Sequence, residues 1–104
     1  MERDYVRTVK VFKALCDERR LRILDLLKSG EKCACVLTEQ LDIPQSSLSY
    51  HMKVLCESGI VVAREEGKWT HYTICGSGSQ RAADLLQEIT SVQVSAGSCD
   101  TCRK

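Results

Sequence analysis

Residues 44–74 constrain the fold most, because a helical pattern with two unlike faces runs directly into a pattern of two short strands. The apolar residues of the helical part recur at steps of four and three positions: Leu48, Met52 and Leu55. Gly59 ends this helix, and the run "IVVAREEGKWTHYTI" indicates two strands around a tight turn at Glu66 and Gly67. We therefore predict a helix over about residues 44–57 that is joined to a β-hairpin.

Helical patterns also precede and follow this segment. Residues 5–15 and the stretch after Asp17, a suitable N-cap, have apolar residues at helical spacing, and a short helix ends before Pro44. The run "GSGSQ" is expected to break the chain before a last helix that begins near Ala82. This order is that of a winged helix-turn-helix with one extra helix at each end. The predicted fold class is mainly α with a small β-hairpin.

Length and charge limit the assembly and the partners of the chain. A domain of 104 residues buries only a modest core, which favours a homodimer. The chain has neither an apolar leader nor the roughly 18 apolar residues of a membrane span, so we expect a soluble, cytoplasmic protein. The net charge of +1 means that nucleic-acid binding has to come from local arrangement and two symmetric half-sites. We predict one domain over residues 1–93 and a flexible, cysteine-containing tail over 94–104.

The face of the predicted helix 44–57 opposite its apolar stripe is polar and almost free of acidic residues. Such side chains can reach base edges in the major groove, and a hairpin after the helix supplies phosphate contacts. The predicted DNA-contacting residues are Gln45, Ser46, Ser47, Ser49, Tyr50, His51 and Lys53 on the helix and Arg64 and Lys68 on the hairpin. The plain alternative is a solvated surface helix. For His51 a hydrogen bond within the domain is a second expectation, and Trp69 and Tyr72 are expected to pack against the core.

Seven cysteines in a chain expected to be cytoplasmic favour metal ligands or thiol chemistry over structural disulfides. Cys33 and Cys35 flank one alanine in "EKCACVLTEQ", and Cys99 and Cys102 have a C-x2-C spacing near the C-terminus. Soft thiolates select thiophilic ions, and trivalent arsenic and antimony take three sulfurs. Residues two apart in a regular helix point about 200° apart. Cys33 and Cys35 can therefore share an ion only where the start of the helix is distorted.

The run "EKCACVLTEQLDIPQSSLSYHMKVLCESGIVVAREEGKWTHYTI" and the upstream run "FKALCDERRLRILDLL" resemble the arsenic-responsive branch of the ArsR/SmtB family of bacterial repressors. The likeness is most specific at C-A-C, at "SYHMKVLCESGIV" and at "REEGKWTHY". It implies a homodimer in which the first and last helices of each subunit pair, an operator DNA with two-fold symmetry, and an effector that lowers DNA affinity. No cofactor is expected for DNA binding itself.

The familiar pattern of this family has a third cysteine three residues after the pair, where this chain has Thr38. The expected effector is arsenite or antimonite. Its expected ligands are the pair and one or both thiols of the tail: Cys33, Cys35, Cys99 and Cys102. Some relatives bind arsenic elsewhere, which makes Cys16 and Cys56 a rival set. The other expectation for Cys16 and Cys56 is that of small buried residues.

Three alternative functions remain open from the sequence. A repressor of the same fold could respond to cadmium, lead or zinc, or to thiol oxidation, and a set of four thiols would also suit cadmium or zinc. A thiol-disulfide enzyme using the terminal C-x2-C is disfavoured, because that motif normally opens a helix in a βαβ unit. We therefore expect no enzyme. The third alternative is a DNA-architectural or protein-interaction module in which the cysteines have no role.

Overall fold

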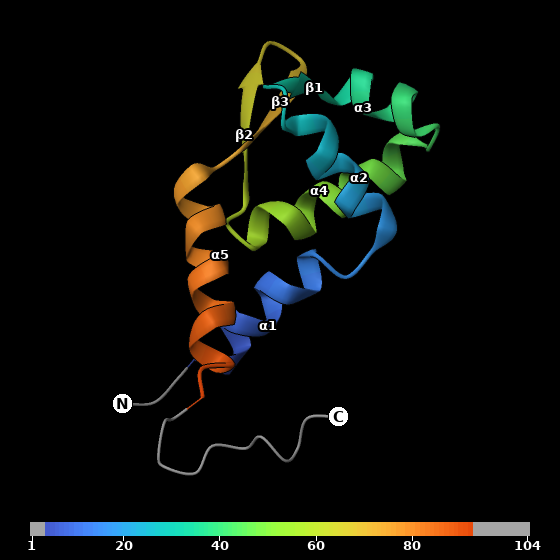
Figure 1. Ribbon diagram of the computed structural model, residues 1–104. Coiled ribbons are helices and arrows are strands. Elements are labelled where there is room, and N and C mark those ends of the chain that lie inside the picture. The colour runs from blue at the N-terminus through green and yellow to red at the C-terminus, as the bar shows by residue number, and fades with distance from the viewer. Residues whose placement is uncertain (1–3, 93–104) are drawn as a thin grey trace.

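The computed structural model describes residues 4–92 (Figure 1). Its elements follow in the order α1 (Tyr5–Ala14), α2 (Glu18–Leu27), β1 (Lys32–Cys33), α3 (Ala34–Leu41), α4 (Gln45–Glu57), β2 (Val61–Glu66), β3 (Trp69–Ile74) and α5 (Gly76–Ile89). The predicted winged helix-turn-helix with an extra helix at each end is confirmed: α3 and α4 form the helix-turn-helix, and β2 and β3 form the wing. The predicted tail, residues 94–104, lies outside the described residues.

The wing is the larger part of a three-stranded antiparallel sheet with the strand order β1-β3-β2. Glu66 pairs with Trp69, so that a two-residue loop of Gly67 and Lys68 joins β2 to β3, one residue later than the sequence pattern suggested. Gly67 has a φ of 65°, a left-handed value that suits the first residue of such a loop. The strand β1 was not predicted, because its two residues are too few to form a pattern.

The hydrophobic core lies where α2, α3 and α4 meet the sheet. Its largest fully buried side chains are Ile23, Leu37, Leu48, Met52, Leu55 and Val61. They include the whole apolar stripe predicted for α4. Burying a side chain of this size stabilises the fold by roughly 2 kcal/mol. The stripe therefore fixes α4 against its neighbours and leaves its other face free.

The start of α2, the end of α3 and the start of α4 are each set by a residue with a particular backbone or capping role. Asp17 caps α2, because its carboxylate accepts hydrogen bonds from the backbone N–H of Arg19 at 2.7 Å and of Arg20 at 3.3 Å. Asp42, in a left-handed conformation with φ 55°, ends α3, and Pro44 is the residue before α4. This short turn directs α4 across α3.

The last helix begins earlier than expected. The run "GSGSQ" does not break the chain but forms the start of α5, so this expectation is wrong. Cys75 caps the first turn, where its Sγ accepts a hydrogen bond from the Gly78 N–H at 3.4 Å. Gly78 is buried, and a Cβ at this position would overlap the carbonyl oxygen of Gly59. Gly78 therefore permits a close contact between two backbones.

Replacing Gly78 by alanine is expected to lower the free energy of unfolding by about 2 kcal/mol, because the new methyl group forces α5 away from the domain. Urea denaturation measures this change. Gly76→Ala is the matched control, since nothing lies within 4 Å of a Cβ at Gly76. It should change stability by less than about 0.5 kcal/mol. Equal losses in both variants would show that the contact with Gly59 is not the cause.

Candidate nucleic-acid interface and thiol pair

One face of α4 presents polar side chains to solvent. Five of the predicted contact residues lie exposed on it: Gln45, Ser46, Ser49, Tyr50 and Lys53. Ser47 is half-buried, and the opposite side of the helix buries the apolar stripe. No acidic side chain precedes Glu57 on this helix. The first half of α4 therefore carries groups of the type that hydrogen-bond to base edges and phosphates.

His51 lies in the interior and not on the exposed face of α4. It is only 6% exposed, and its Nδ1 accepts a hydrogen bond of 3.0 Å from Nη1 of Arg20, which is itself only 4% exposed. The pKa of His51 is lowered, first by burial and further by the charge of Arg20, although Asp17 opposes the shift. His51 is therefore a neutral hydrogen-bond partner within the domain, the second of the two roles expected for it.

Arg20 joins three helices and was missed by the sequence reasoning. Besides His51 on α4, it contacts the end of α1: its Nε donates to the Ala14 carbonyl oxygen and its Nη2 to the Lys13 carbonyl oxygen, each at 3.0 Å. It lies on the buried side of α2 together with Ile23 and Leu27. A charged residue at helical spacing from that apolar stripe was the signal that could have identified it.

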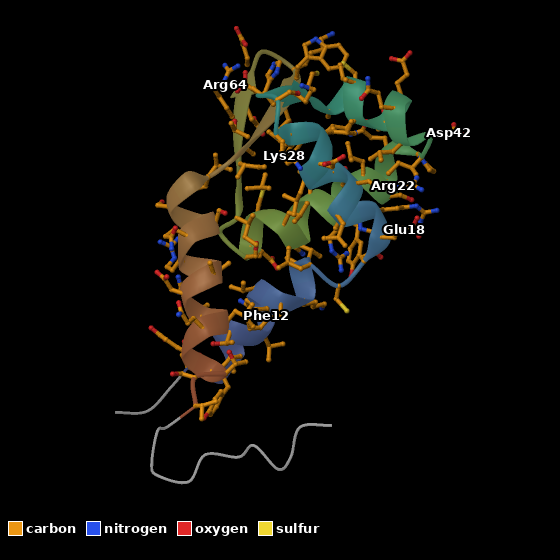
Figure 2. All side chains as sticks on the ribbon, viewed as in Figure 1. Phe12, Glu18, Arg22, Lys28, Asp42 and Arg64 are labelled. Atoms are coloured by element: carbon orange, nitrogen blue, oxygen red, sulfur yellow. The ribbon has the colours of Figure 1, made fainter. Side chains whose placement is uncertain are left out.

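The wing carries two basic residues, Arg64, which forms ion pairs with two carboxylates, and Lys68 in the loop. Arg64 on β2 donates from Nη2 to Oε1 of Glu31 at 2.8 Å, from Nε to Oε2 of Glu31 at 3.0 Å, and from Nη1 to Glu66 at 3.1 Å. Figure 2 shows Arg64 on the wing, far from α1 and α5. Lys68 lies exposed in the loop. Both basic residues are thus on the wing as expected, but Arg64 is held by two carboxylates.

The two wing aromatics lie in different surroundings. Tyr72 packs against the core, as expected. Trp69 is 52% exposed at the start of β3, so the expectation that it packs in the core is wrong. Trp69 is exposed because it lies beside the loop, at the end of the hairpin.

The thiols of Cys33 and Cys35 meet at the junction of β1 and α3. Cys33 is the N-cap residue of α3, with extended backbone at φ −75° and ψ 148°. It therefore lies outside the helical spiral that would have separated the two side chains, and the Cys35 thiol donates to Cys33 Sγ at 3.0 Å. The distortion that the sequence required for a shared ion is thus present, since the pair spans a strand and a helix.

The pKa values of the two paired thiols are shifted in opposite directions. The hydrogen bond from the Cys35 thiol, together with the backbone N–H groups of Cys35 and Val36, lowers the pKa of Cys33. The neighbouring Cys33 sulfur raises the pKa of Cys35. One of the two protons is therefore lost more easily than an isolated thiol would lose it. A thiol that deprotonates more readily, beside a second sulfur, suits the binding of a soft ion.

Within residues 4–92, the other cysteines do not gather around this pair. Cys16 is exposed after α1, so the expectation of a small buried residue is wrong for it, while Cys56 is half-buried against the core and burial raises its pKa. The side chain of Thr38 donates to the Cys35 carbonyl oxygen at 2.9 Å. Cys99 and Cys102 lie outside the described residues.

Residues 4–92 lack both a cluster of metal-binding side chains and a membrane-spanning helix. No three His, Cys, Asp or Glu side chains in this part of the chain gather closely enough to hold a metal ion. None of the helices described is both long and apolar enough to cross a lipid bilayer.

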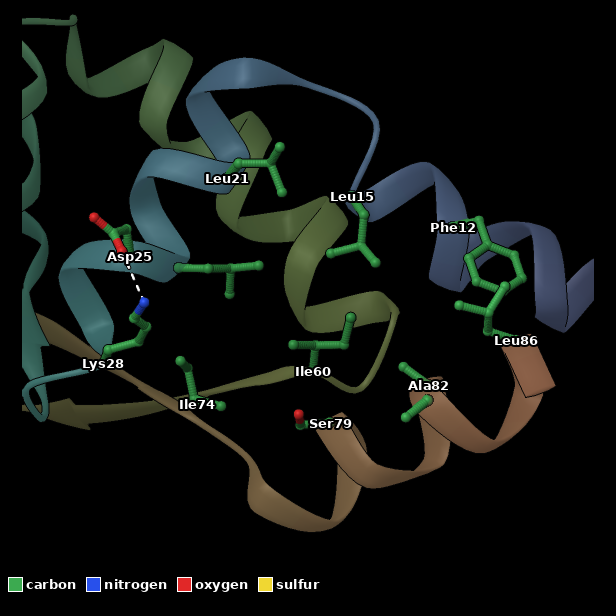
Figure 3. Close-up of a pocket in the computed structure, with 12 residues that line it drawn as sticks. Phe12, Leu15, Leu21, Asp25, Lys28, Ile60, Ile74, Ser79, Ala82 and Leu86 are labelled. Carbon is green, nitrogen blue, oxygen red and sulfur yellow. Dashed lines mark ion pairs between the residues drawn. The ribbon is translucent and has the colours of Figure 1, made fainter.

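An apolar cavity of about 490 Å³ lies between α2, α5 and the strands (Figure 3). The ion pair between Asp25 and Lys28, 3.1 Å long, lies at its edge. Among the residues that the structure describes, no cysteine and no residue of α4 lines the cavity, so it is separate from the thiol pair and from the polar face. Nearby, α1 and the end of the described chain carry exposed apolar side chains: Tyr5, Val6, Val9, Leu86, Ile89 and Val92.

Comparison with known proteins identifies the family. Residues 17–62 match the family of bacterial regulatory proteins named arsR. An HTH-type transcriptional regulator of Methanocaldococcus jannaschii is 37% identical over 86 residues, which are 82% of this chain and 97% of the relative. The arsenical resistance operon repressor of Escherichia coli is 39% identical over 85 residues, 81% of this chain and 73% of the repressor.

A solved structure agrees with these sequences. The homodimeric winged helix-turn-helix DNA-binding domain from Mycobacterium bovis matches with a TM-score of 0.67 and 32% identity, over 83% of this chain and 80% of that domain. The relatives are regulators of transcription and not enzymes. With its helix-turn-helix, its wing and its polar-faced α4, this chain belongs to the arsR family of DNA-binding bacterial regulatory proteins.

Proposed function

We propose that the protein is a transcriptional repressor that responds to trivalent arsenic or antimony. It binds a two-fold symmetric operator as a homodimer, and it releases the operator when cysteine thiolates bind the metalloid. The observation that carries this proposal is the thiol pair of Cys33 and Cys35, 3.0 Å apart, at the start of the helix that supports α4. The likeness to an arsenical resistance operon repressor supports the choice of effector.

The polar face of α4 supports the DNA-binding part of the proposal. In helix-turn-helix proteins the first residues of the second helix read base edges in the major groove. In this chain Gln45, Ser46, Ser49, Tyr50 and Lys53 would take this role, with Ser47 at the border of the face. On the wing, Lys68 would bind a flanking phosphate, as would Arg64 once it leaves its carboxylate partners.

The exposed apolar side chains of α1 and α5 support the homodimer. These helices lie side by side at one end of the molecule (Figure 1). A contiguous apolar surface of this kind is typical of an interface between protein chains. The homodimeric relative from Mycobacterium bovis has the same fold. Pairing through these helices would leave both α4 helices free for two half-sites of the operator.

The third ligand is assigned to the tail. Arsenous acid exchanges one hydroxyl group for each thiol, whose proton leaves with that hydroxyl group as water, and trivalent arsenic prefers three sulfur ligands. Cys33 and Cys35 supply two. We assign the third to Cys102 or Cys99, because Thr38 occupies the position of the third cysteine in the familiar pattern. The rival set of Cys16 and Cys56 lacks the supporting observation of two sulfurs in contact.

The position of the thiol pair at the junction of β1 and α3 suggests how the metalloid would release operator DNA. Cys33 is the last residue of β1 and the N-cap of α3, and α3 packs on α4. A metalloid that draws both sulfurs toward a third ligand alters the start of α3 and thereby the support of α4. If DNA and metalloid favour different arrangements of this junction, each weakens the binding of the other by the same coupling free energy.

Titration with arsenite tests the proposal. The probe is a DNA duplex with a two-fold symmetric site, selected by the protein from a random pool. Arsenite should lower its affinity roughly 5- to 150-fold, the usual range for allosteric coupling. Cadmium, zinc and a thiol oxidant are titrated in parallel. If the complex persists in arsenite but dissociates with one of these agents, that agent and not the metalloid is the effector.

A further inference from the structure

The two carboxylates that hold Arg64 occupy all three nitrogens of its guanidinium. Glu31 accepts from Nη2 and Nε, and Glu66 accepts from Nη1. The side chains are accessible to solvent, with 51% of Arg64, 36% of Glu31 and 66% of Glu66 exposed. The guanidinium also holds the pKa of the Glu31 carboxyl below its ordinary value. Glu31 takes the edge formed by Nε and Nη2, so an operator phosphate can bind Arg64 through these two nitrogens only by displacing Glu31.

Strand register places this ion pair beside the thiol pair. Cys33 on β1 pairs with His71 on β3, and His71 pairs with Arg64 on β2. Residues directly opposite on antiparallel strands share one face of the sheet, so these three side chains form a row. Glu31 precedes Cys33 by two residues and reaches Arg64 in space. The sheet thus connects the thiol site to the wing without using α3 or α4.

We propose that Glu31 limits operator affinity by competing with phosphate for Arg64, and that it links the thiol pair to the wing. In the free protein Glu31 holds the guanidinium against β1. In the operator complex Arg64 leaves Glu31 for a phosphate. A metalloid on Cys33 fixes the segment that carries Glu31 and so favours the ion pair over the phosphate contact. This second step rests on the proposed function, whereas the competition between carboxylate and phosphate does not.

The test is a double-mutant cycle on operator affinity in the full-length protein. Glu31→Gln should bind DNA about fivefold more tightly, because an exposed ion pair is lost as a competitor in each subunit of the dimer. Because Arg64 reaches its phosphate in both proteins, the slope of log K against log salt should stay the same within about 0.5. In the background of Arg64→Gln, the same Glu31→Gln change should have no effect beyond a factor of about 1.5. Equal effects in both backgrounds would overturn the competition.

Glu65→Gln is the matched control for charge. Glu65 is exposed on β2 beside Arg64 and points to the opposite face of the sheet, so its replacement removes the same charge from the wing. It should change operator affinity less than twofold. If Glu65→Gln raised operator affinity as much as Glu31→Gln does, the cause would be the loss of a negative charge from the wing and not competition for Arg64. Weaker DNA binding by Glu31→Gln would show that the ion pair supports the wing and would also overturn the proposal.

The link to the thiols has a separate readout. The quantity measured is the ratio of operator affinities without and with arsenite. This ratio should be at least three times smaller for Glu31→Gln than for the unaltered protein. The same arsenite factor in both proteins would overturn the link and leave the competition standing. If arsenite does not release the unaltered protein, the proposed effector is wrong, and the link is tested with whichever of cadmium, zinc or oxidant does release it. Release by none of these agents overturns the link, while the double-mutant cycle on operator affinity still decides the competition.

Discussion

Replacing Cys33 or Cys35 by serine is expected to abolish the release of operator DNA by arsenite. Either change removes one of the two sulfurs that lie 3.0 Å apart, and a hydroxyl group is a hard ligand with little affinity for trivalent arsenic. The effect of arsenite on affinity should fall from roughly 5- to 150-fold to a factor near one. Fluorescence anisotropy of labelled operator, with and without arsenite, measures it. Affinity without arsenite should stay within about threefold, because neither residue lies on the polar face of α4.

Control variants separate this site from the other cysteines. Cys75→Ser alters a thiol that caps α5, so the response to arsenite should persist. Replacing both Cys99 and Cys102 by serine should remove the third ligand, and adding Thr38→Cys to that variant should restore release. Thr38 lies one turn after Cys35 and contacts its carbonyl oxygen, which places the new thiol beside the pair. Loss of response in Cys16 or Cys56 variants alone would move the site to that rival set.

Replacing Arg20 by methionine is expected to destabilise the protein by about 3 kcal/mol. The change leaves the carbonyl oxygen of Ala14 and the ring of His51 without their buried donor, and it removes one of the two donors to the carbonyl oxygen of Lys13, which keeps the Cys16 N–H. Unsatisfied buried groups cost about 1–3 kcal/mol each, with part regained by relaxation. Urea denaturation followed by circular dichroism measures the loss. Operator affinity should fall as well under conditions where the variant is folded, because α4 loses the hydrogen bond by which Arg20 links His51 to the end of α1.

Arg22→Met is the matched control for Arg20. Arg22 lies on the same helix, exposed, and pairs with Glu18 at 3.0 Å (Figure 2). An exposed pair of this spacing contributes about 0.3–0.5 kcal/mol. Similar losses for the two variants would mean that the buried hydrogen bonds of Arg20 add no more than a surface charge does. A loss confined to Arg20→Met, with Arg22→Met near zero, is the expected result.

Much of the fold could be predicted because it depends on local patterns. The apolar stripe of α4, the N-cap Asp17 and the two strands around a tight turn are each contained within a few residues, and the structure has all three. The start of α5 could not be predicted, because Gly78 serves a contact with Gly59, which is distant in sequence. Propensity alone treats a glycine-rich run as a break, and tertiary packing overrides it here.

The candidate site was predicted only in part for a similar reason. Polar residues on α4 follow from the spacing of its apolar stripe, so most of them are exposed as expected. The partners of Arg64 and His51 are 33 and 31 residues away in sequence, and no local pattern reveals them. The convergence of Cys33 and Cys35 depends on one backbone conformation at the boundary of β1 and α3. Sequence could state that condition but could not decide whether it was met.

The contact between Gly78 and Gly59 would also affect how the two subunits of the proposed dimer move. Both residues lack a side chain, so no change of rotamer can lengthen or shorten the contact. We expect the first turn of α5 to stay fixed on the domain, so that the helix rotates about this turn and does not slide along it. In a dimer paired through α5, the separation of the two α4 helices would then change by rotation alone. Operators whose half-sites differ in spacing would be distinguished by the angle at this point.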